Sequence, residues 1–307
     1  MAKFELNLED NSFDLHKKLN SGEWKPDSYI FFFIQDPKLR KIHKASVRDR
    51  VLYQAVYRKL YQVFDKNFIF DSYSSRNGKG THKGVERLEK FTRKTSENHK
   101  SSAFALKCDI RKFFDSIDHK ILLELISRKI SDRKILDLIE KIISSFETLP
   151  GKGLPLGNVT SQLFANIYLN ELDQFAKHEL KVKFYARYCD DFVIIDKSLQ
   201  KLQLYLEKLK NFCQKTLLLE IHPKKIIFRK IHPGADFLGM VILPFRKILR
   251  TKTKRRMLRR IAKIKEEFEE GNIDIGRIES PVQSYLGMLS HVKGEKIMRQ
   301  IERIFWD

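Results

Sequence analysis

Two adjacent carboxylates, Asp190 and Asp191, stand between two runs of residues that favour β-structure. Residues 184–188 and 192–195 are rich in Tyr, Phe, Val and Ile, so the segment predicts a strand, a tight turn and a second strand. The turn places two negative charges side by side. This is unfavourable unless a cation binds, and a divalent metal ion is the simplest one. The alternative is an ordinary polar turn, because Asp is common in turns.

A third carboxylate, Asp109, ends another apolar segment, residues 103–110, which predicts a buried strand. If this strand lies beside the hairpin, the three carboxylates converge into an all-oxygen site for a hard cation. We expect two Mg²⁺ ions, for which Mn²⁺ can substitute. Two such ions can activate an attacking hydroxyl and stabilise a departing phosphate oxygen, which is the chemistry of nucleotidyl transfer.

The charge of the chain indicates a polyanionic partner. Its 307 residues include 60 Lys and Arg against 39 Asp and Glu, a formal net charge of +21. Nucleic acid is the first candidate and an anionic membrane surface the second. No apolar run could span a membrane, and the N-terminus lacks a signal peptide. Three cysteines that fit neither a zinc site nor a disulfide framework indicate a reducing cytoplasm, so we expect a cytoplasmic protein that has no membrane partner.

The rest of the chain must position these acids. Residues 29–34 predict a strand, Asp36 and Pro37 a turn, and residues 38–43 a second, basic strand. Ser46 begins a capping box for a helix that runs to about residue 64, and Thr81 can cap the next helix. Further helices are expected at about 118–126, 131–146, 158–180, 198–215, 280–291 and 294–306, a basic helical region from residue 250, and short strands at 217–221, 226–229 and 236–243.

Four blocks, in this order and spacing, resemble those of reverse transcriptases. They are Asp109-Ile110-Arg111-Lys112-Phe113-Phe114-Asp115-Ser116-Ile117, Tyr188-Cys189-Asp190-Asp191, His222-Pro223-Lys224-Lys225 and Phe237-Leu238-Gly239-Met240. The resemblance implies an α+β right-hand polymerase fold. Residues 1–245 would form the fingers and a palm whose antiparallel sheet carries the catalytic Asp residues, and residues 246–307 a basic helical thumb. It also implies an RNA-directed DNA polymerase that binds template RNA, the RNA–cDNA hybrid and dNTPs.

One loop departs from the general pattern of the family. Most reverse transcriptases have Gln-Gly-x-x-x-Ser-Pro, whereas this chain has Leu156-Gly157-Asn158-Val159-Thr160-Ser161-Gln162. This pattern is similar to that of diversity-generating retroelements, whose enzymes copy a template RNA into cDNA with errors at adenines. They work with a small basic accessory variability protein, and they occur in bacteria, archaea and phages. The end of the chain near residue 307 agrees with this subtype, since intron-encoded relatives carry further domains.

Roles for individual residues follow from the resemblance. Asp109, Asp190 and Asp191 would be catalytic and bind the metals, helped by the Ile110 carbonyl. Phe114 would exclude a ribose 2′-hydroxyl. The other expected nucleotide contacts are Arg76 and Lys79 to the triphosphate and Leu156 and Gln162 beside the nucleotide and template base, and Tyr188 and Cys189 are expected to contact nucleic acid.

Plainer roles remain open for most of these residues. Phe114 could be a core aromatic beside Phe113, and Cys108 and Cys189 could be small buried apolar residues. Arg76 and Lys79 could belong to a solvated loop, and Leu156 and Gln162 could simply pack. For Asp115 and Asp118 we expect structural roles in a turn and a helix cap.

The expected thumb carries the clearest basic cluster, formed by Lys252, Lys254, Arg255, Arg256, Arg259 and Arg260. On a helix, positions 252, 255/256 and 259/260 share one face. Such a face would follow the backbone of an A-form RNA–DNA hybrid, which is recognised by its shape. A solvated face is the alternative.

Two other functions are compatible with these patterns. One is a reverse transcriptase of the phage-defence or retron type, with a different RNA partner. The other is a catalytically idle RNA-binding protein with a palm-like fold, although the intact set of three Asp residues argues against it.

Overall fold

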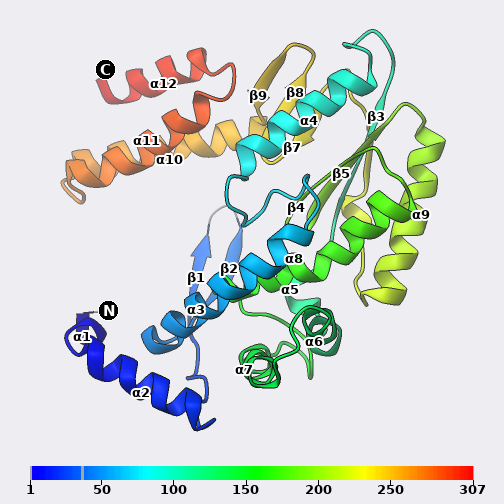
Figure 1. Ribbon diagram of the computed structural model, residues 1–307. Coiled ribbons are helices and arrows are strands. Elements are labelled where there is room, and N and C mark those ends of the chain that lie inside the picture. Colours follow the sequence, from blue (N-terminus) through cyan, green and yellow to red (C-terminus); the bar gives the residue numbers. More distant parts are fainter. Residues whose placement is uncertain (1, 36–37, 307) are drawn as a thin grey trace.

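The structure is a computed structural model that describes residues 2–35 and 38–306 (Figure 1). The turn predicted at Asp36 and Pro37 lies outside the described residues. Helices and antiparallel sheets are mixed along the chain, so the α+β class expected from the sequence is confirmed.

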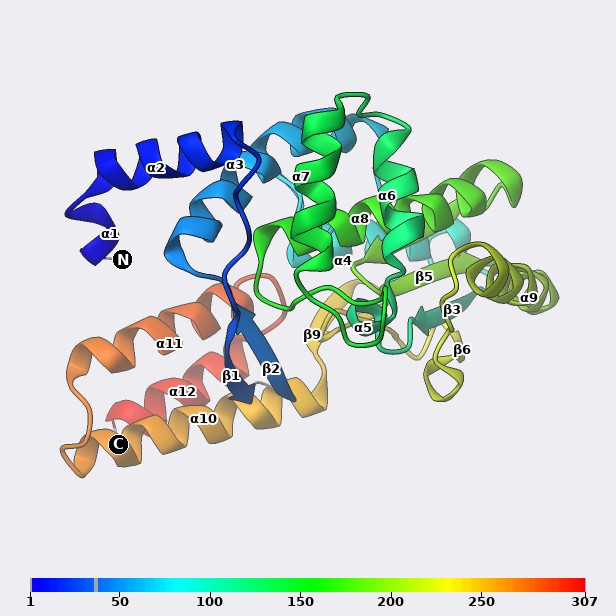
Figure 2. The same cartoon turned by 90° about the horizontal axis from the view of Figure 1, so that it is seen from below.

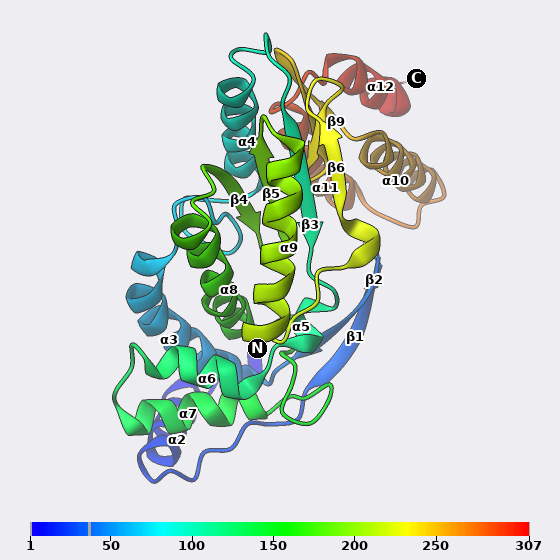
Figure 3. The same cartoon turned by 90° about the vertical axis from the view of Figure 1, so that its right-hand side faces the viewer.

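The central sheet has the strand order β4-β5-β3-β6, and every pairing in it is antiparallel. Its strands are β3 (Phe104–Asp109), β4 (Phe184–Tyr188), β5 (Asp191–Asp196) and β6 (Ile227–Lys230). Phe192 and Ile194 of β5 belong to the core with α8 (Val159–Gln174) and α9 (Leu199–Thr216), whereas Val193 and Ile195 face the core with α4 (Thr81–Thr95). Because the sheet is covered on both faces, β5 has four consecutive buried apolar residues (Figure 3).

The elements that were expected to form the fingers surround one end of this sheet. Strands β1 (Ile30–Gln35) and β2 (Leu39–Lys44) form the predicted antiparallel hairpin, and every residue of β1 is exposed. The hydroxyl of Ser46 accepts the backbone N–H of Asp49 at 3.2 Å and caps α3 (Val47–Phe64), as predicted. The remaining helices of this region are α1 (Ala2–Glu5), α2 (Leu8–Asn20), α5 (Phe113–Ser116), α6 (His119–Ser127) and α7 (Arg133–Ser144); after α8 a π-helical turn, Phe175–Glu179, continues the expected long helix.

Some predicted elements were wrong in detail. Residues 217–221 form no strand, and only Ile221 makes a bridge, to Ile110. The single strand expected at 236–243 is instead a hairpin of β7 (Ala235–Phe237) and β8 (Met240–Leu243), because Leu238 and Gly239 turn with φ of +51° and +83°. A further strand, β9 (Arg246–Leu249), pairs with β8 and was not predicted. The cap of α4 is Gly80, and Thr81 is the first residue of that helix.

The C-terminal region is helical, with α10 (Thr251–Glu269), α11 (Ile275–Leu289) and α12 (Glu295–Trp306). Figure 2 shows these helices beside the fingers hairpin, separate from α6 and α7. The buried face of α10, which carries Met257 and Ile261, belongs to the same core as the face of the central sheet that α4 covers. The rings of His82 in α4 and His291 after α11 stack with centroids 3.7 Å apart, which adds a second contact to this region. No helix among the described residues is long and apolar enough to cross a membrane.

Candidate active site

The backbone brings the three predicted acids together. Asp109 at the end of β3 lies directly opposite Asp191 at the start of β5. The backbone N–H of Ile110 donates a hydrogen bond to the Asp190 carbonyl at 3.1 Å, so the turn is also tied to the end of β3. Cys189, the residue before the acids, has a φ of +53°, a conformation that is uncommon for residues other than glycine. The convergence expected from the sequence is therefore present in the backbone.

Asp190 and Asp191 lie in an environment that disfavours their charge. Burial raises the pKa of Asp190, and the nearby Asp109 raises it further. Burial also raises the pKa of Asp191, while Lys107, with its Nζ 3.7 Å from Asp191 Oδ2, works in the opposite direction. Lys225 Nζ lies 2.5 Å from Asp109 Oδ1. Two lysines thus provide local positive charge, and Lys225 comes from the block His222-Pro223-Lys224-Lys225.

The three acids fit a hard divalent cation in their chemistry, because all of their donor atoms are carboxylate oxygens on adjacent backbone positions. Among residues 2–35 and 38–306, however, no group of three or more His, Cys, Asp and Glu side chains is arranged to hold a metal ion. Lys225 is paired with Asp109, so a metal ion bound there would compete with this lysine for the carboxylate.

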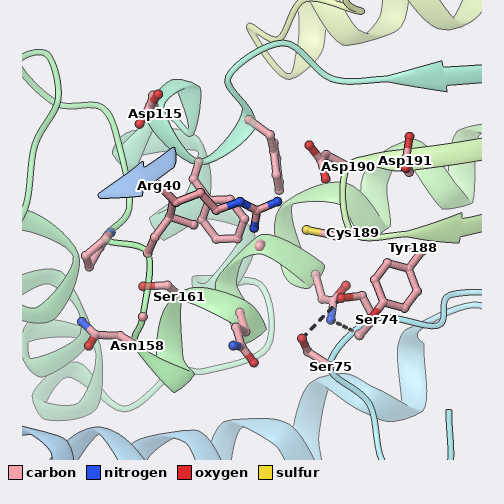
Figure 4. A pocket seen from close by; sticks show the side chains of 18 of the residues that line it. Arg40, Ser74, Ser75, Asp115, Asn158, Ser161, Tyr188, Cys189, Asp190 and Asp191 are labelled. Carbon is pink, nitrogen blue, oxygen red and sulfur yellow. Dashed lines mark hydrogen bonds between the residues drawn. The ribbon is translucent and has the colours of Figure 1, made fainter. Parts of the chain in front are cut away.

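A cavity of about 590 Å³ opens beside the turn (Figure 4). Its walls come from the fingers hairpin, the loop before α4, helix α5, the loop before α8 and the turn itself. The residues that line it include Arg40, Ser74, Ser75, Phe114, Asp115, Leu156, Gln162, Tyr188, Cys189, Asp190 and Asp191. The cavity therefore brings together Asp190, Asp191 and five further residues to which the sequence assigned nucleotide or nucleic-acid contacts.

Arg40 is a residue of this cavity that the sequence did not single out. Figure 4 shows its guanidinium reaching in from β2 toward the turn that carries Cys189 and Asp190. The hairpin is held over the cavity by a hydrogen bond from the His43 N–H to the Leu156 carbonyl at 2.7 Å. The sequence predicted a basic strand here, but it contains several cations, and only the strand's orientation decides which one faces the acids.

Arg76 and Lys79 lie away from the cavity, in contrast to the expectation that they contact a triphosphate. The Arg76 side chain is only 7% exposed, and its Nε lies 2.6 Å from Asp65 Oδ1. Lys79 donates to the Phe70 carbonyl at 2.7 Å and lies over the Phe70 ring. These two cations hold the loop 67–80 against its neighbours, so the structure brings neither of them to the site.

The remaining predicted residues have distinct surroundings. Phe114 is half-buried and packs edge-to-face on the fully buried Phe113, with ring centroids 5.4 Å apart. Leu156, in the loop before α8, is half-buried, and Gln162, in the first turn of α8, is exposed; both line the cavity. Burial raises the pKa of the Cys189 thiol to about 12, and the thiol is protonated at neutral pH.

Asp118 has the predicted structural role. Its carboxylate accepts the backbone N–H groups of Lys120 and Ile121 and so caps α6. Asp115, which was also expected to be structural, is an exposed residue of the cavity rim. All three cysteines are free.

Most of the basic cluster of α10 lies outside the buried face of the helix. Five of the six predicted residues are exposed, Lys252, Arg255, Arg256, Arg259 and Arg260, and Lys254 is half-buried. A second cavity of about 470 Å³ is lined by Arg40 of the hairpin, Leu238 and Gly239 of the turn between β7 and β8, and Arg250 and Arg256. Basic side chains thus line the surface from the turn at Asp190 to α10.

Comparison with known proteins identifies relatives of this site and fold. Residues 26–242 match the family described as reverse transcriptase (RNA-dependent DNA polymerase). Protein YkfC of Escherichia coli is 24% identical over 73% of this chain and 69% of its own length. Group II intron-encoded protein LtrA of Lactococcus lactis is 26% identical over 68% of this chain, which spans only 36% of that protein.

Solved structures of other proteins have a similar fold. An apo telomerase from Candida tropicalis superimposes with a TM-score of 0.59 over 95% of this chain and 64% of the telomerase chain, at 12% identity. A telomerase from Candida albicans in complex with a fragment of telomeric RNA gives a TM-score of 0.55, at 10% identity. At this level of identity the likeness concerns the fold, and the predicted right-hand fold is confirmed.

Proposed function

Because this chain belongs to the reverse transcriptase (RNA-dependent DNA polymerase) family, we propose that it extends a DNA strand on an RNA template at the turn that carries Asp190 and Asp191. The observation that supports this most strongly is the register of β3 against β5, which places Asp109 opposite Asp191 at the edge of the cavity. Bound divalent cations, with Mg²⁺ as the expected ion, would activate the attacking 3′-hydroxyl and stabilise the departing phosphate oxygen.

The protein side chains supply binding and orientation. Asp109, Asp190 and Asp191, with the Ile110 carbonyl, would bind the divalent cations. Because the carboxylates are partly buried, water screens their attraction to the cations only weakly. Arg40 pairs with the triphosphate of the incoming dNTP, since it is the cation that the hairpin presents to the cavity. The ring of Phe114 occupies the space that a ribose 2′-hydroxyl would need.

The basic face of α10 binds the RNA–cDNA hybrid through its phosphates, so this binding weakens as salt is added. Tyr188 and Cys189 contact the nucleic acid at the turn.

Within this family we assign the chain to diversity-generating retroelements, with adenine-mutagenised cDNA as the product and a small basic accessory variability protein as a partner. The support comes from Leu156, in the loop before α8, and Gln162, in the first turn of α8, since both residues line the cavity. An apolar Leu side chain offers no hydrogen bond to a nucleotide or a template base, whereas the Gln that is usual in the family can both donate and accept one. Selection of the correct nucleotide then depends on its base pairing with the template, without a hydrogen bond from this side chain.

The test is primer extension on a defined RNA template with Mg²⁺ and dNTPs, followed by sequencing of the cDNA. The double variant Asp190→Ala, Asp191→Ala should lose extension and keep its fold. Equal activity in that variant would rule out the assigned metal site. RNA binding without any dNTP incorporation by the native chain would favour the idle RNA-binding protein.

The subtype has its own test in the same assay. Misincorporation should be concentrated at template adenines, and the variant Leu156→Gln should reduce it there. An error rate at adenines no higher than at the other bases would contradict the retroelement assignment without affecting the polymerase assignment.

A further inference from the structure

A fully buried arginine stands two residues before the left-handed turn of the active site. The Arg187 side chain is 0% exposed and lies between β4, α8 and the loop before α4. Burial alone would lower the pKa of Arg187, but the paired carboxylate of Asp173 raises it above the usual value. The side chain is therefore a charged group inside the protein, and such groups need complete pairing.

All five N–H groups of this guanidinium have acceptors. Nε and Nη2 bind the two carboxylate oxygens of Asp173 at 2.7 and 2.6 Å, which is a bidentate pair. Nη2 also donates to Ser72 Oγ at 3.1 Å, and Nη1 donates to Asn166 Oδ1 at 3.2 Å. The last bond runs from Nη1 to the carbonyl of Cys189 at 3.0 Å. That carbonyl belongs to the residue with positive φ that directly precedes Asp190.

The same residue also connects the turn to the neighbouring wall of the cavity. The Arg187 N–H donates to the Asp71 carbonyl, and the Arg187 carbonyl accepts the Tyr73 N–H, both at 2.9 Å. Asn166 donates through Nδ2 to the Ser74 carbonyl at 2.9 Å. Ser74 lines the cavity, so one network supports both the catalytic turn and the wall beside it.

Two of the residues that bind Arg187 are polar positions of α8, Asn166 and Asp173. Asn166 and Asp173 lie about two helical turns apart, so their side chains project from the same face of the helix toward β4. Both are buried, with relative exposures of 2% and 0%. A helix that only filled the core would have apolar residues at such positions.

We propose that Arg187 is a positioning residue, clamped by Asp173 and Asn166, that fixes the Cys189 carbonyl and thereby the placement of Asp190 and Asp191. The arginine touches neither substrate nor metal. It acts by holding a strained backbone in the one conformation that presents both carboxylates beside Asp109. The kinetic part of the test rests on the polymerase function proposed above, and the hydrogen-exchange part does not.

The test uses two variants of the full chain. Arg187→Met combined with Asp173→Leu removes both buried charges, so neither is left without its partner. Arg187→Lys keeps the positive charge for Asp173 but cannot reproduce the planar fork that also reaches Cys189. Tyr185→Phe is the control, because the Tyr185 hydroxyl donates to Asp173 Oδ1 at 2.7 Å and the Arg187–Cys189 bond does not depend on it.

Hydrogen exchange of the metal-free protein is measured on peptides that cover residues 184–196. Both Arg187 variants should exchange faster at the turn, whereas Tyr185→Phe should match the native chain there. In primer extension, kcat of the two variants should fall by about a hundredfold, the effect of a misplacement of about 1 Å. The metal concentration that gives half-maximal rate should rise.

The proposal is overturned if either Arg187 variant folds and shows native exchange at the turn. It is also overturned if Tyr185→Phe loosens the turn as much as Arg187→Lys does, because the pair with Asp173 would then serve stability alone. Faster exchange at the turn in a chain that never polymerises would support the clamp and contradict the proposed polymerase function, so the two failures are distinguishable.

Discussion

The contact between the loop at Gly157 and the fingers hairpin makes a sharp prediction for the variant Gly157→Ala. Gly157 has a φ of +117°, and an added Cβ would lie 2.8 Å from Ile42 Cγ2 and 3.1 Å from the His43 carbonyl oxygen. Gly80 is the matched control, because its φ is +121° and no heavy atom of the described chain would lie within 4 Å of its added Cβ. Comparing the two alanine variants separates backbone strain from the contact with the hairpin.

The magnitudes follow from these geometries. Backbone strain should reduce the free energy of unfolding by about 1–3 kcal/mol in both variants. The overlap with the hairpin should reduce it by roughly a further 1–3 kcal/mol in Gly157→Ala only. Thermal unfolding should show the difference, at about 2–4 °C per kcal/mol. Adding Ile42→Ala to Gly157→Ala should recover part of the loss, because it removes the nearer of the two overlapping groups.

The same variant should weaken nucleotide binding. Ile42 and Arg40 belong to one strand, so pushing that strand away from the loop also withdraws the Arg40 guanidinium from the cavity. In primer extension, KM for dNTP should rise in Gly157→Ala and stay near the native value in Gly80→Ala. If Gly157→Ala is no less stable than Gly80→Ala, the loop does not support the hairpin as described, and the role given to Arg40 loses its basis.

Three more predictions can be tested separately. Because burial and Asp109 raise the pKa of Asp190 in the folded chain, ionisation of Asp190 opposes folding. The metal-free protein should therefore gain stability relative to Asp190→Asn as pH falls from neutral through that raised pKa, as measured by thermal unfolding at several pH values; an unchanged difference between the two chains would contradict the shift. Phe114→Val should raise incorporation of rNTPs relative to dNTPs in primer extension, and an unaltered ratio would show that Phe114 only packs. Arg259→Gln with Arg260→Gln should weaken binding of an RNA–DNA hybrid and lower the slope of log affinity against log salt by up to about 2; a native salt slope would place the hybrid elsewhere.

Local patterns in the sequence were sufficient for much of this protein. The alternation of β-favouring runs around Asp190 and Asp191 predicted the hairpin, and the capping residues Ser46 and Asp118 predicted two helix starts. These features depend on neighbours within a few residues, so propensity and hydrogen-bonding chemistry determine them. The hairpin at Leu238 and Gly239 was missed because the flanking apolar residues continue without a polar break.

The composition of the site could be predicted only in part, because several of its residues act through distant partners. The sequence identified Asp109 and the turn by their chemistry, but it could not tell that Arg40 enters the cavity while Arg76 pairs with Asp65. Both arginines are basic residues in polar surroundings. Their direction depends on how the hairpin and the loop 67–80 pack on the rest of the chain.

By itself the sequence determined the acids, the basic balance of the chain and the order of the blocks, and these fixed the expected chemistry and family. Only the tertiary structure decided which groups surround the acids: Lys225 at Asp109, Arg40 above the cavity and Arg187 beneath the turn. The physical reason is that a charged side chain removed from water needs a partner nearby, and the packing of the whole chain decides which partner is close. The stretch that carries Asp190 and Asp191 thus specifies a turn, while α8 and β3 give that turn its position.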